Sequence, residues 1–328
     1  MSPAVNSPRV AVTLPDEPAE LGEQSRTARE AWSRALASPE LQTVARALTA
    51  AAIGADDCAR ESATITEAPE TRRRLEAIRD AVAGPIAGVP RGSFERFVLA
   101  HAALGSIREL ESAPVAPAVK RLAWSGLSRF ADGRTVVDLS ENRFVALCKI
   151  ATVRRFPAGQ FDWERSGLPR AWLPRIRPVS ALTRILSMVT VQWRAFSPAF
   201  FIHLAVTYPV RALLEREALK SYHRMARSMA LQPDVHGLIA SSWLHSPDTF
   251  TISPHLAWLN SVFTDNGAVV ATMGAAPPDC GVLAQSVERE RAFAEGRFTP
   301  TIGLIIWPRR EMLAWAAAHP ELDEAGGA

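Results

Sequence analysis

The stretch VHGLIASSWL, residues 235–244, is a continuous apolar run, which is typical of a strand buried on both faces of a sheet. Two further strand-like runs follow it, AVVATMG at 268–274 and TPTIGLIIWP at 299–308. A segment with helical character comes after each run: HLAWLNSVF, then GVLAQSVERERAFAEG, then REMLAWAAAHPE. We therefore predict a β-α-β-α-β-α unit over residues 232–320.

The order of this unit predicts where a ligand would bind. If the three strands are parallel, their connections are right-handed crossovers and all strand-to-helix loops leave one edge of the sheet. Ligands of open α/β sheets bind at that edge. The loops are HSPDTFTIS, AAPPDCG and PRR, and they would bring together His245, Asp248, Asp279, Cys280, Arg309 and Arg310.

These residue types suggest distinct roles. His245 is our candidate general base, because histidine titrates near neutral pH, and Asp248 would orient it. Cys280 near a helix start is a candidate nucleophile. Arg309 and Arg310 open the last helix, where cations oppose the helix dipole unless an anion binds, so we assign them, with the helix-capping Asp279, to cofactor binding. A surface loop histidine, and pairing of the arginines with Glu311, are the alternatives.

The rest of the chain is mostly helical in pattern. Ser38-Pro39, Ser93 and Ser140 each precede an apolar-periodic segment and resemble helix starts. We expect an α+β protein in which a helix-rich N-terminal region packs on a small C-terminal α/β layer of at least three strands. The predicted parts are a disordered tail (1–20), a helical region (21–156), a basic connector with long helices at 179–194 and 197–231 (157–231), the C-terminal unit (232–320) and a disordered tail (321–328).

Charge is distributed unevenly along the chain. The net charge of the 328 residues is only +3, yet Lys and Arg outnumber Asp and Glu by 19 to 7 between residues 118 and 231. Such an excess suits an anionic small molecule or an acidic carrier protein, although a solvated basic face would show the same pattern. Arginines and aromatic residues alternate over 154–178, but no nucleic-acid-binding motif accompanies them, so we do not expect nucleic acid as a partner.

Several classes of protein are disfavoured by the residue pattern. The three cysteines stand far apart without metal-ligand spacing. Glu217 and His223 are six residues apart, on nearly opposite faces of a helix, so we predict no metal site. The start of the chain has no basic and apolar leader, and Ala195–Tyr208 is too short to span a bilayer, so we expect a cytoplasmic protein without a transmembrane segment.

Residues 215–274 resemble the GNAT-type acyltransferases, in particular the branch that includes the autoinducer synthases. The likeness consists of a long helix, EREALKSYHRMARSMAL, then the strand HGLIASSWL, a short helix, and the strand AVVATMG. It covers under a third of the chain, and the pyrophosphate-loop motif Arg/Gln-x-x-Gly-x-Gly/Ala is absent after His236–Leu244. The resemblance implies a thioester donor, either CoA or the phosphopantetheine of an acyl carrier.

Three functions are compatible with the sequence. The first is an enzyme that transfers an acyl group from such a thioester to a small amine or alcohol. The second is a non-catalytic scaffold that binds an acidic partner through its basic middle, and the third is a metal-dependent oxygenase. The substrate and the oligomeric state do not follow from the sequence.

Overall fold

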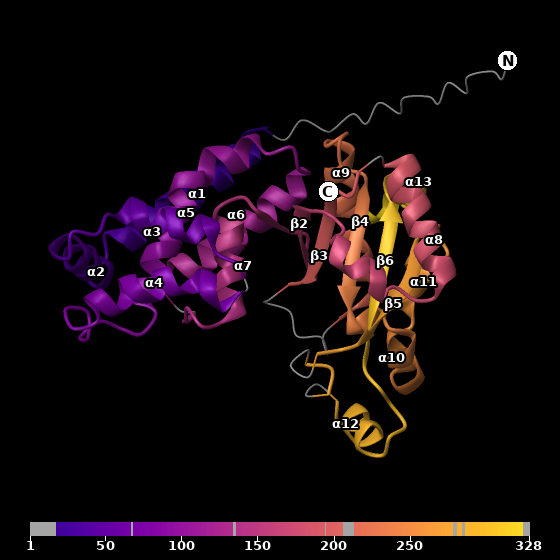
Figure 1. Cartoon of the computed structure of the whole chain (residues 1–328). Coiled ribbons are helices and arrows are strands. Elements are labelled where there is room, and N and C mark those ends of the chain that lie inside the picture. The colour runs from indigo at the N-terminus through magenta and orange to yellow at the C-terminus, as the bar shows by residue number, and fades with distance from the viewer. Residues whose placement is uncertain are drawn as a thin grey trace.

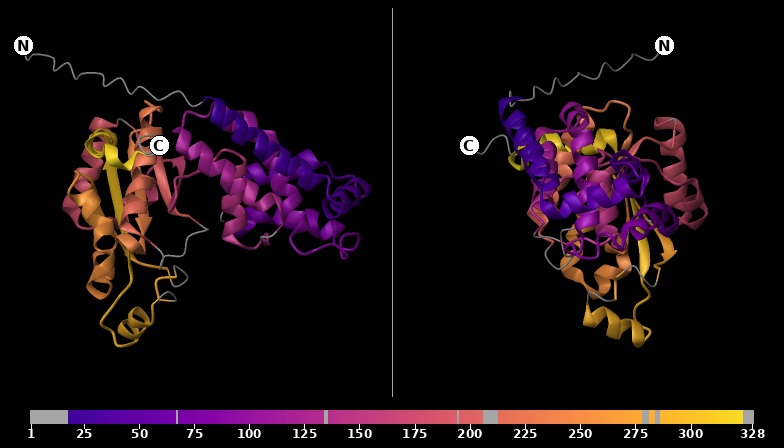
Figure 2. Two further views of the ribbon diagram at one scale, coloured as in Figure 1. Left: turned by 180° about the vertical axis from the view of Figure 1, so that it is seen from behind. Right: turned by 90° about the vertical axis from the view of Figure 1, so that its left-hand side faces the viewer.

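The computed structural model describes residues 18–66, 68–133, 136–193, 195–205, 213–277, 281–283 and 286–323. These residues form a helical half and a sheet-containing half that lie side by side (Figures 1 and 2). The expected α+β class, with a helix-rich N-terminal region beside a C-terminal sheet, is confirmed. The predicted tails fall outside the described residues, apart from 18–20, which begin the first helix, and 321–323.

The helical half is built around one central helix, α5 (Ser93–Ser112), which contacts five of its neighbours. Residues on all sides of α5 are buried, as expected for a helix in the interior of a bundle. The start expected at Ser38-Pro39 is confirmed, with Pro39 as the first helical residue of α2. The other helices are α1 (Pro18–Leu36), α2 (Pro39–Ala50), α3 (Ala55–Thr64), α4 (Pro69–Val82), α6 (Pro117–Ala131) and α7 (Asn142–Ala151).

The second half contains a six-stranded sheet with the spatial order β1-β2-β3-β4-β6-β5. β2 is antiparallel to both β1 and β3, β3 and β4 are parallel, and β6 lies antiparallel between β4 and β5. The strands are β1 (Arg155–Pro157), β2 (Phe161–Ser166), β3 (Ala199–Leu204), β4 (Gly237–Ser242), β5 (Val269–Ala275) and β6 (Thr301–Pro308).

Helices cover both faces of the sheet, so side chains that alternate along a strand enter two separate cores. On β6, Ile305 and Trp307 belong to the larger core and Leu304 and Ile306 to the smaller one. The larger core includes α9 (Glu215–Ala230), α11 (Trp258–Thr264) and α13 (Arg309–Ala318). The smaller core includes α8 (Val179–Ser187) and the π-helical turn η2 (Met188–Gln192).

The expectation of three parallel C-terminal strands is wrong, because β6 runs against both of its neighbours. The chain between β5 and β6, which contains α12 (Val287–Ala294), leaves the sheet and returns at the same end (Figure 1). Its two ends meet where the Ala276 N–H donates to the Pro300 carbonyl at 2.8 Å. The connection is therefore a long hairpin rather than a crossover, and a hairpin joins antiparallel strands.

The long helix expected at 197–231 is also wrong in its first part. Residues Ala199–Leu204, AFFIHL, form β3, and the helix α9 begins only at Glu215. The aromatic and β-branched side chains of this stretch suit a strand, and β3 pairs with β2 on one side and β4 on the other. The basic middle of the chain thus contributes half of the strands of the sheet.

Candidate functional site

The parallel strands β3 and β4 pair only over a short ladder. It runs from Phe200 opposite Leu238 to Ile202 opposite Ala240, so the last two residues of each strand are unpaired across this boundary. In open α/β sheets, ligands bind outside the carboxyl ends of neighbouring parallel strands. The ends of β3 and β4 are the only such place among the described strands, because no other adjacent pair is parallel.

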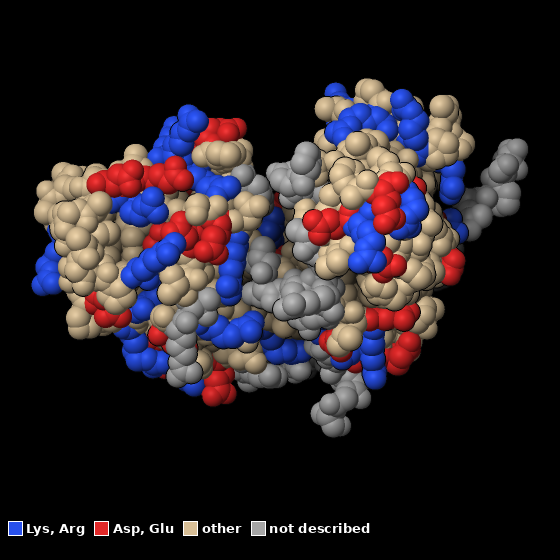
Figure 3. Space-filling view, turned by 90° about the horizontal axis from the view of Figure 1, so that it is seen from below, with Lys and Arg blue, Asp and Glu red and all other residues tan. Residues whose placement is uncertain are grey.

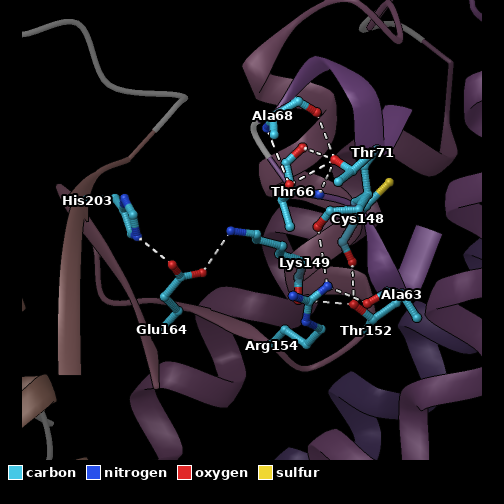
Figure 4. A network of polar contacts seen from close by, with 11 residues as sticks. Ala63, Thr66, Ala68, Thr71, Cys148, Lys149, Thr152, Arg154, Glu164 and His203 are labelled. Carbon is cyan, nitrogen blue, oxygen red and sulfur yellow. Dashed lines mark hydrogen bonds and ion pairs between the residues drawn. The ribbon is translucent and has the colours of Figure 1, made fainter. Parts of the chain in front are cut away.

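A group of ionisable side chains lies on one face of β2 and β3 and extends to α7. We call Lys149, Asp162, Glu164 and His203 the acid–base cluster (Figure 4 shows all but Asp162). Its position follows from strand alternation. Phe161 and Trp163 enter the larger core. Because side chains alternate along a strand, Asp162 and Glu164 point to the opposite face of the sheet. Asp162 is directly opposite His203 in the β2–β3 register.

Glu164 is the centre of this cluster, because its two oxygens contact two different elements. Oε2 accepts a hydrogen bond from the Lys149 ammonium at 2.9 Å, and Oε1 lies 3.1 Å from His203 Nε2. Burial would raise the pKa of Glu164, but hydrogen bonds from His203 and Lys149, together with their positive charge, outweigh it and hold the pKa at about 2. Glu164 is therefore ionised throughout the neutral range.

Asp162 is the second carboxyl group of the cluster and behaves differently. Only 3% of the residue is exposed, and burial raises its pKa to about 7, although the nearby charge of Arg155 acts in the opposite direction. Two carboxyl groups on one strand thus differ widely in pKa because one is paired with cations and the other is desolvated. Such separation is typical of sites that handle protons.

A hollow of about 740 Å³ between the helical half and the sheet reaches the cluster. Lys149 and Glu164 form part of its wall, together with Arg154, Phe156 and Arg165. This volume is in the range of small-molecule sites. Basic and acidic side chains are interspersed on the face of the molecule seen from below (Figure 3), so over the described residues of that face the basic excess does not form a single positive surface.

His245, the predicted base, lies in the interior with 3% of the residue exposed. Its Nδ1 is 3.2 Å from Asn260 Oδ1, and the Asn260 amide donates back to the His245 carbonyl at 2.9 Å. Burial lowers the pKa of His245 to about 4, with the Asn260 contact opposing the shift, so the ring is neutral. Asp248 accepts a hydrogen bond from Thr301 at 2.7 Å and does not take part in these contacts.

Arg309 and His245 do not share an edge of the sheet, which corrects the predicted pocket. Since β6 is antiparallel to β4, Arg309 follows the end of β6 that pairs with Gly237, whereas His245 follows the far end of β4. The Arg309 guanidinium donates to the carbonyl of Met229 in the last turn of α9 and to those of Gln232 and Val235 after it.

Of the three remaining predicted residues, the structure describes only Arg310. Arg310 follows Arg309 at the start of α13 and is exposed. Asp279 and Cys280 lie outside the described residues. The structure therefore brings together none of the six predicted site residues at a common rim, as far as it describes them.

Sequence reasoning missed Lys149, Glu164 and His203, although a signal for two of them was present. FDWER (161–165) alternates apolar and polar residues over its first four positions, which places Asp162 and Glu164 on one face of a strand, and FFIHL (200–204) has a single polar residue, His203, within an apolar run. The pairing of those strands across some forty residues, and the approach of α7, are not visible in the sequence.

The described ranges contain neither a metal-ligand cluster nor a membrane-spanning helix. There, no group of three or more His, Cys, Asp or Glu side chains could hold a metal ion. No described helix is both long enough and apolar enough to cross a bilayer.

Comparisons with known proteins give little further information. No protein-family model matches the chain, and no curated protein matches its sequence. Among solved structures, a crystal structure of an acyltransferase in complex with decanoyl-CoA and teicoplanin is similar at 16% identity and a TM-score of 0.42, over 92% of this chain and 91% of that chain. A likeness of this size carries no argument about function, so the argument below rests on the geometry of the acid–base cluster.

Proposed function

We propose that this protein transfers an acyl group from a CoA or acyl-carrier thioester to a small amine or alcohol, with His203 as the general base. The observation that carries the proposal is the contact of His203 Nε2 with the ionised Glu164 carboxylate at 3.1 Å, next to the unpaired ends of β3 and β4. A carboxylate in this position orients an imidazole and stabilises the imidazolium that forms when it accepts a proton.

The surrounding fold is consistent with this proposal. The helix, strand, helix and strand on which the resemblance to the GNAT-type acyltransferases rests are all present as α9, β4, α11 and β5. His203 is on β3, the strand beside β4. The donor would lie at the carboxyl ends of β3 and β4, close to His203 near the end of β3.

The proposed step balances as a simple acyl transfer. The lone pair of the amine nitrogen, or of the alcohol oxygen, forms a bond to the thioester carbonyl carbon, and the nucleophile's proton passes to His203. The tetrahedral intermediate then collapses, the carbon–sulfur bond breaks, and the leaving thiolate takes the proton from the imidazolium. The products are an amide or ester and a free thiol, and His203 returns to its neutral form.

The test is thiol release from a panel of acyl-CoA and acyl-carrier donors with small amines and alcohols, with the acylated product identified by mass. We expect His203→Gln to lower kcat/KM by about 10²- to 10⁴-fold, the usual contribution of a general base. His255→Gln is the matched control, because His255 is exposed and lies in the 3₁₀ turn Pro254–Leu256 rather than on β3. Full activity in His203→Gln, or no thiol release with any donor together with no binding of CoA by calorimetry, would refute the proposal.

A further inference from the structure

Lys149 is a buried cation of the helical half that contacts the sheet. Only 4% of its side chain is exposed, and its ammonium is held at 2.9 Å by Glu164 Oε2 on β2. Burying an ammonium is costly unless it is paired, so this contact stabilises the packing of α7 against the sheet. Figure 4 shows the resulting chain of contacts from Lys149 through Glu164 to His203.

The charge of Lys149 acts on His203 through the shared carboxylate. With Glu164 alone beside it, the imidazolium form of His203 would be strongly favoured, because an opposite charge in contact raises the pKa of a histidine. Lys149 neutralises that carboxylate from its other oxygen and also repels a second positive charge. Both effects favour the neutral imidazole, which is the form that accepts a proton.

The other described charged groups near β3 have different surroundings. On β2, the second carboxyl group is Asp162, and on β1 the basic group is Arg155, whose charge bears on Asp162. The described part of β4, Gly237–Ser242, has no ionisable side chain. In the 3₁₀ turn η1 (Arg170–Arg175), Arg170 lies over the ring of Phe196 and Arg175 donates to the carbonyl of Met273.

We propose that Lys149 is a positioning residue by which the helical half completes the acid–base site, because its ammonium balances Glu164 and lowers the proton affinity of His203. This inference rests on the proposed function for its catalytic meaning, but its electrostatic content is independent of any substrate. The helical half would then contribute to the chemistry through one side chain and would not serve as a support alone.

The inference predicts the proton affinity of His203 in Lys149→Met. A unit charge on the far side of a shared carboxylate, at an effective dielectric constant of about 20, shifts a pKa by about one to two units. Because His203 and Glu164 are partly exposed, we expect the pKa of His203 to rise by about one unit. The measurement is an NMR pH titration of the full-length protein labelled at its histidine side chains, with His203→Gln used to assign the signal.

Three further variants keep the test decisive. Lys149→Arg retains the charge and should leave the pKa of His203 close to that of the wild type. Glu164→Gln removes the carboxylate and should lower the pKa, the opposite direction, which also covers the case that Lys149→Met does not fold. Lys220→Met is the control, because Lys220 forms an ion pair of the same 2.9 Å length with Glu217 on α9, away from the cluster.

The outcomes separate this inference from the proposed function. In the transfer assay, Lys149→Met should lose activity at low pH and recover it about one pH unit higher, a rescue that structural damage would not show. If Lys149→Met leaves the pKa of His203 unchanged, or Glu164→Gln does not lower it, the inference is wrong. If the pKa values move as expected but no donor is ever turned over, the inference about Lys149 stands and the acyl-transfer function fails.

Discussion

Replacing Arg309 with methionine should destabilise the fold, because this guanidinium binds the end of α9 rather than a ligand. Its Nη1 donates to Met229 O at 2.6 Å, Gln232 O at 2.7 Å and Val235 O at 3.2 Å. The carbonyls at a helix C-terminus are unpaired within the helix and carry partial negative charge. The arginine therefore compensates for its unfavourable place at the start of α13 by stabilising the end of another helix.

The expected loss can be worked from these contacts. Hydrogen bonds from a charged donor contribute about 1.5–3 kcal/mol, and a cation at a helix C-terminus adds about 0.3–1 kcal/mol. Water can reach part of the group after the substitution, because Arg309 is only half-buried. We therefore expect the free energy of unfolding to fall by about 2–3 kcal/mol in Arg309→Met.

The assay is urea unfolding followed by tryptophan fluorescence and circular dichroism, with Arg310→Met as the neighbouring control. Arg310 is exposed, so its loss should change the free energy of unfolding by less than about 0.5 kcal/mol. Equal effects of the two substitutions would refute the reasoning. The reasoning would also be wrong if phosphate or CoA raised the free energy of unfolding of the wild type but not of Arg309→Met, because that result would show that this side chain binds an anion.

Two further predictions concern the interior around β4 and β6. The pKa of His245 is about 4 in the folded chain against 6.5 ordinarily, so the unfolded chain takes up this proton first as the pH falls. The free energy of unfolding should therefore be highest above pH 6.5 and should fall by about 3 kcal/mol towards pH 4. Urea midpoints at pH 4.5 and 7.5 should therefore differ less in His245→Gln than in the wild type, and parallel pH profiles would contradict this. Gly303→Ala should destabilise by more than about 2 kcal/mol, since its Cβ would stand 2.2 Å from the His245 carbonyl carbon, which is backbone and cannot move aside. Gly105→Ala, exposed on α5 with nothing within 4 Å, should stabilise by about 0.5–1 kcal/mol, and a similar thermal shift in both variants would show that the close approach at Gly303 is not real.

Much of the secondary structure could be predicted because it is encoded locally. Apolar runs and helix starts placed β4, β5, β6 and α13 within a few residues of their observed bounds. The main failure among the elements was β3, whose short apolar run fits a buried strand as well as one side of a helix. Periodicity alone does not separate these cases, and pairing with β2 and β4 decided it.

The candidate site was much harder to predict than the elements. The proposed pocket of His245 and Arg309 depended on the direction of β6, and a hydrophobic pattern carries no information on strand direction. Lys149, Glu164 and His203 are far apart in the chain, and the sequence around each gives no indication of the other two. Only the β2–β3 register and the packing of α7 bring them within hydrogen-bonding distance.

The sequence by itself determined which segments are helical or extended, which faces are apolar, and that the middle of the chain is basic, since all of these depend on residues close together along the chain. The tertiary structure alone decided that β6 enters the sheet in reverse between β4 and β5, that Arg309 binds the end of α9, and that Glu164 lies between a lysine and a histidine. The physical reason is that burial and hydrogen bonding between distant segments select one arrangement among several with the same local pattern. The chemistry proposed for this protein depends on that selection.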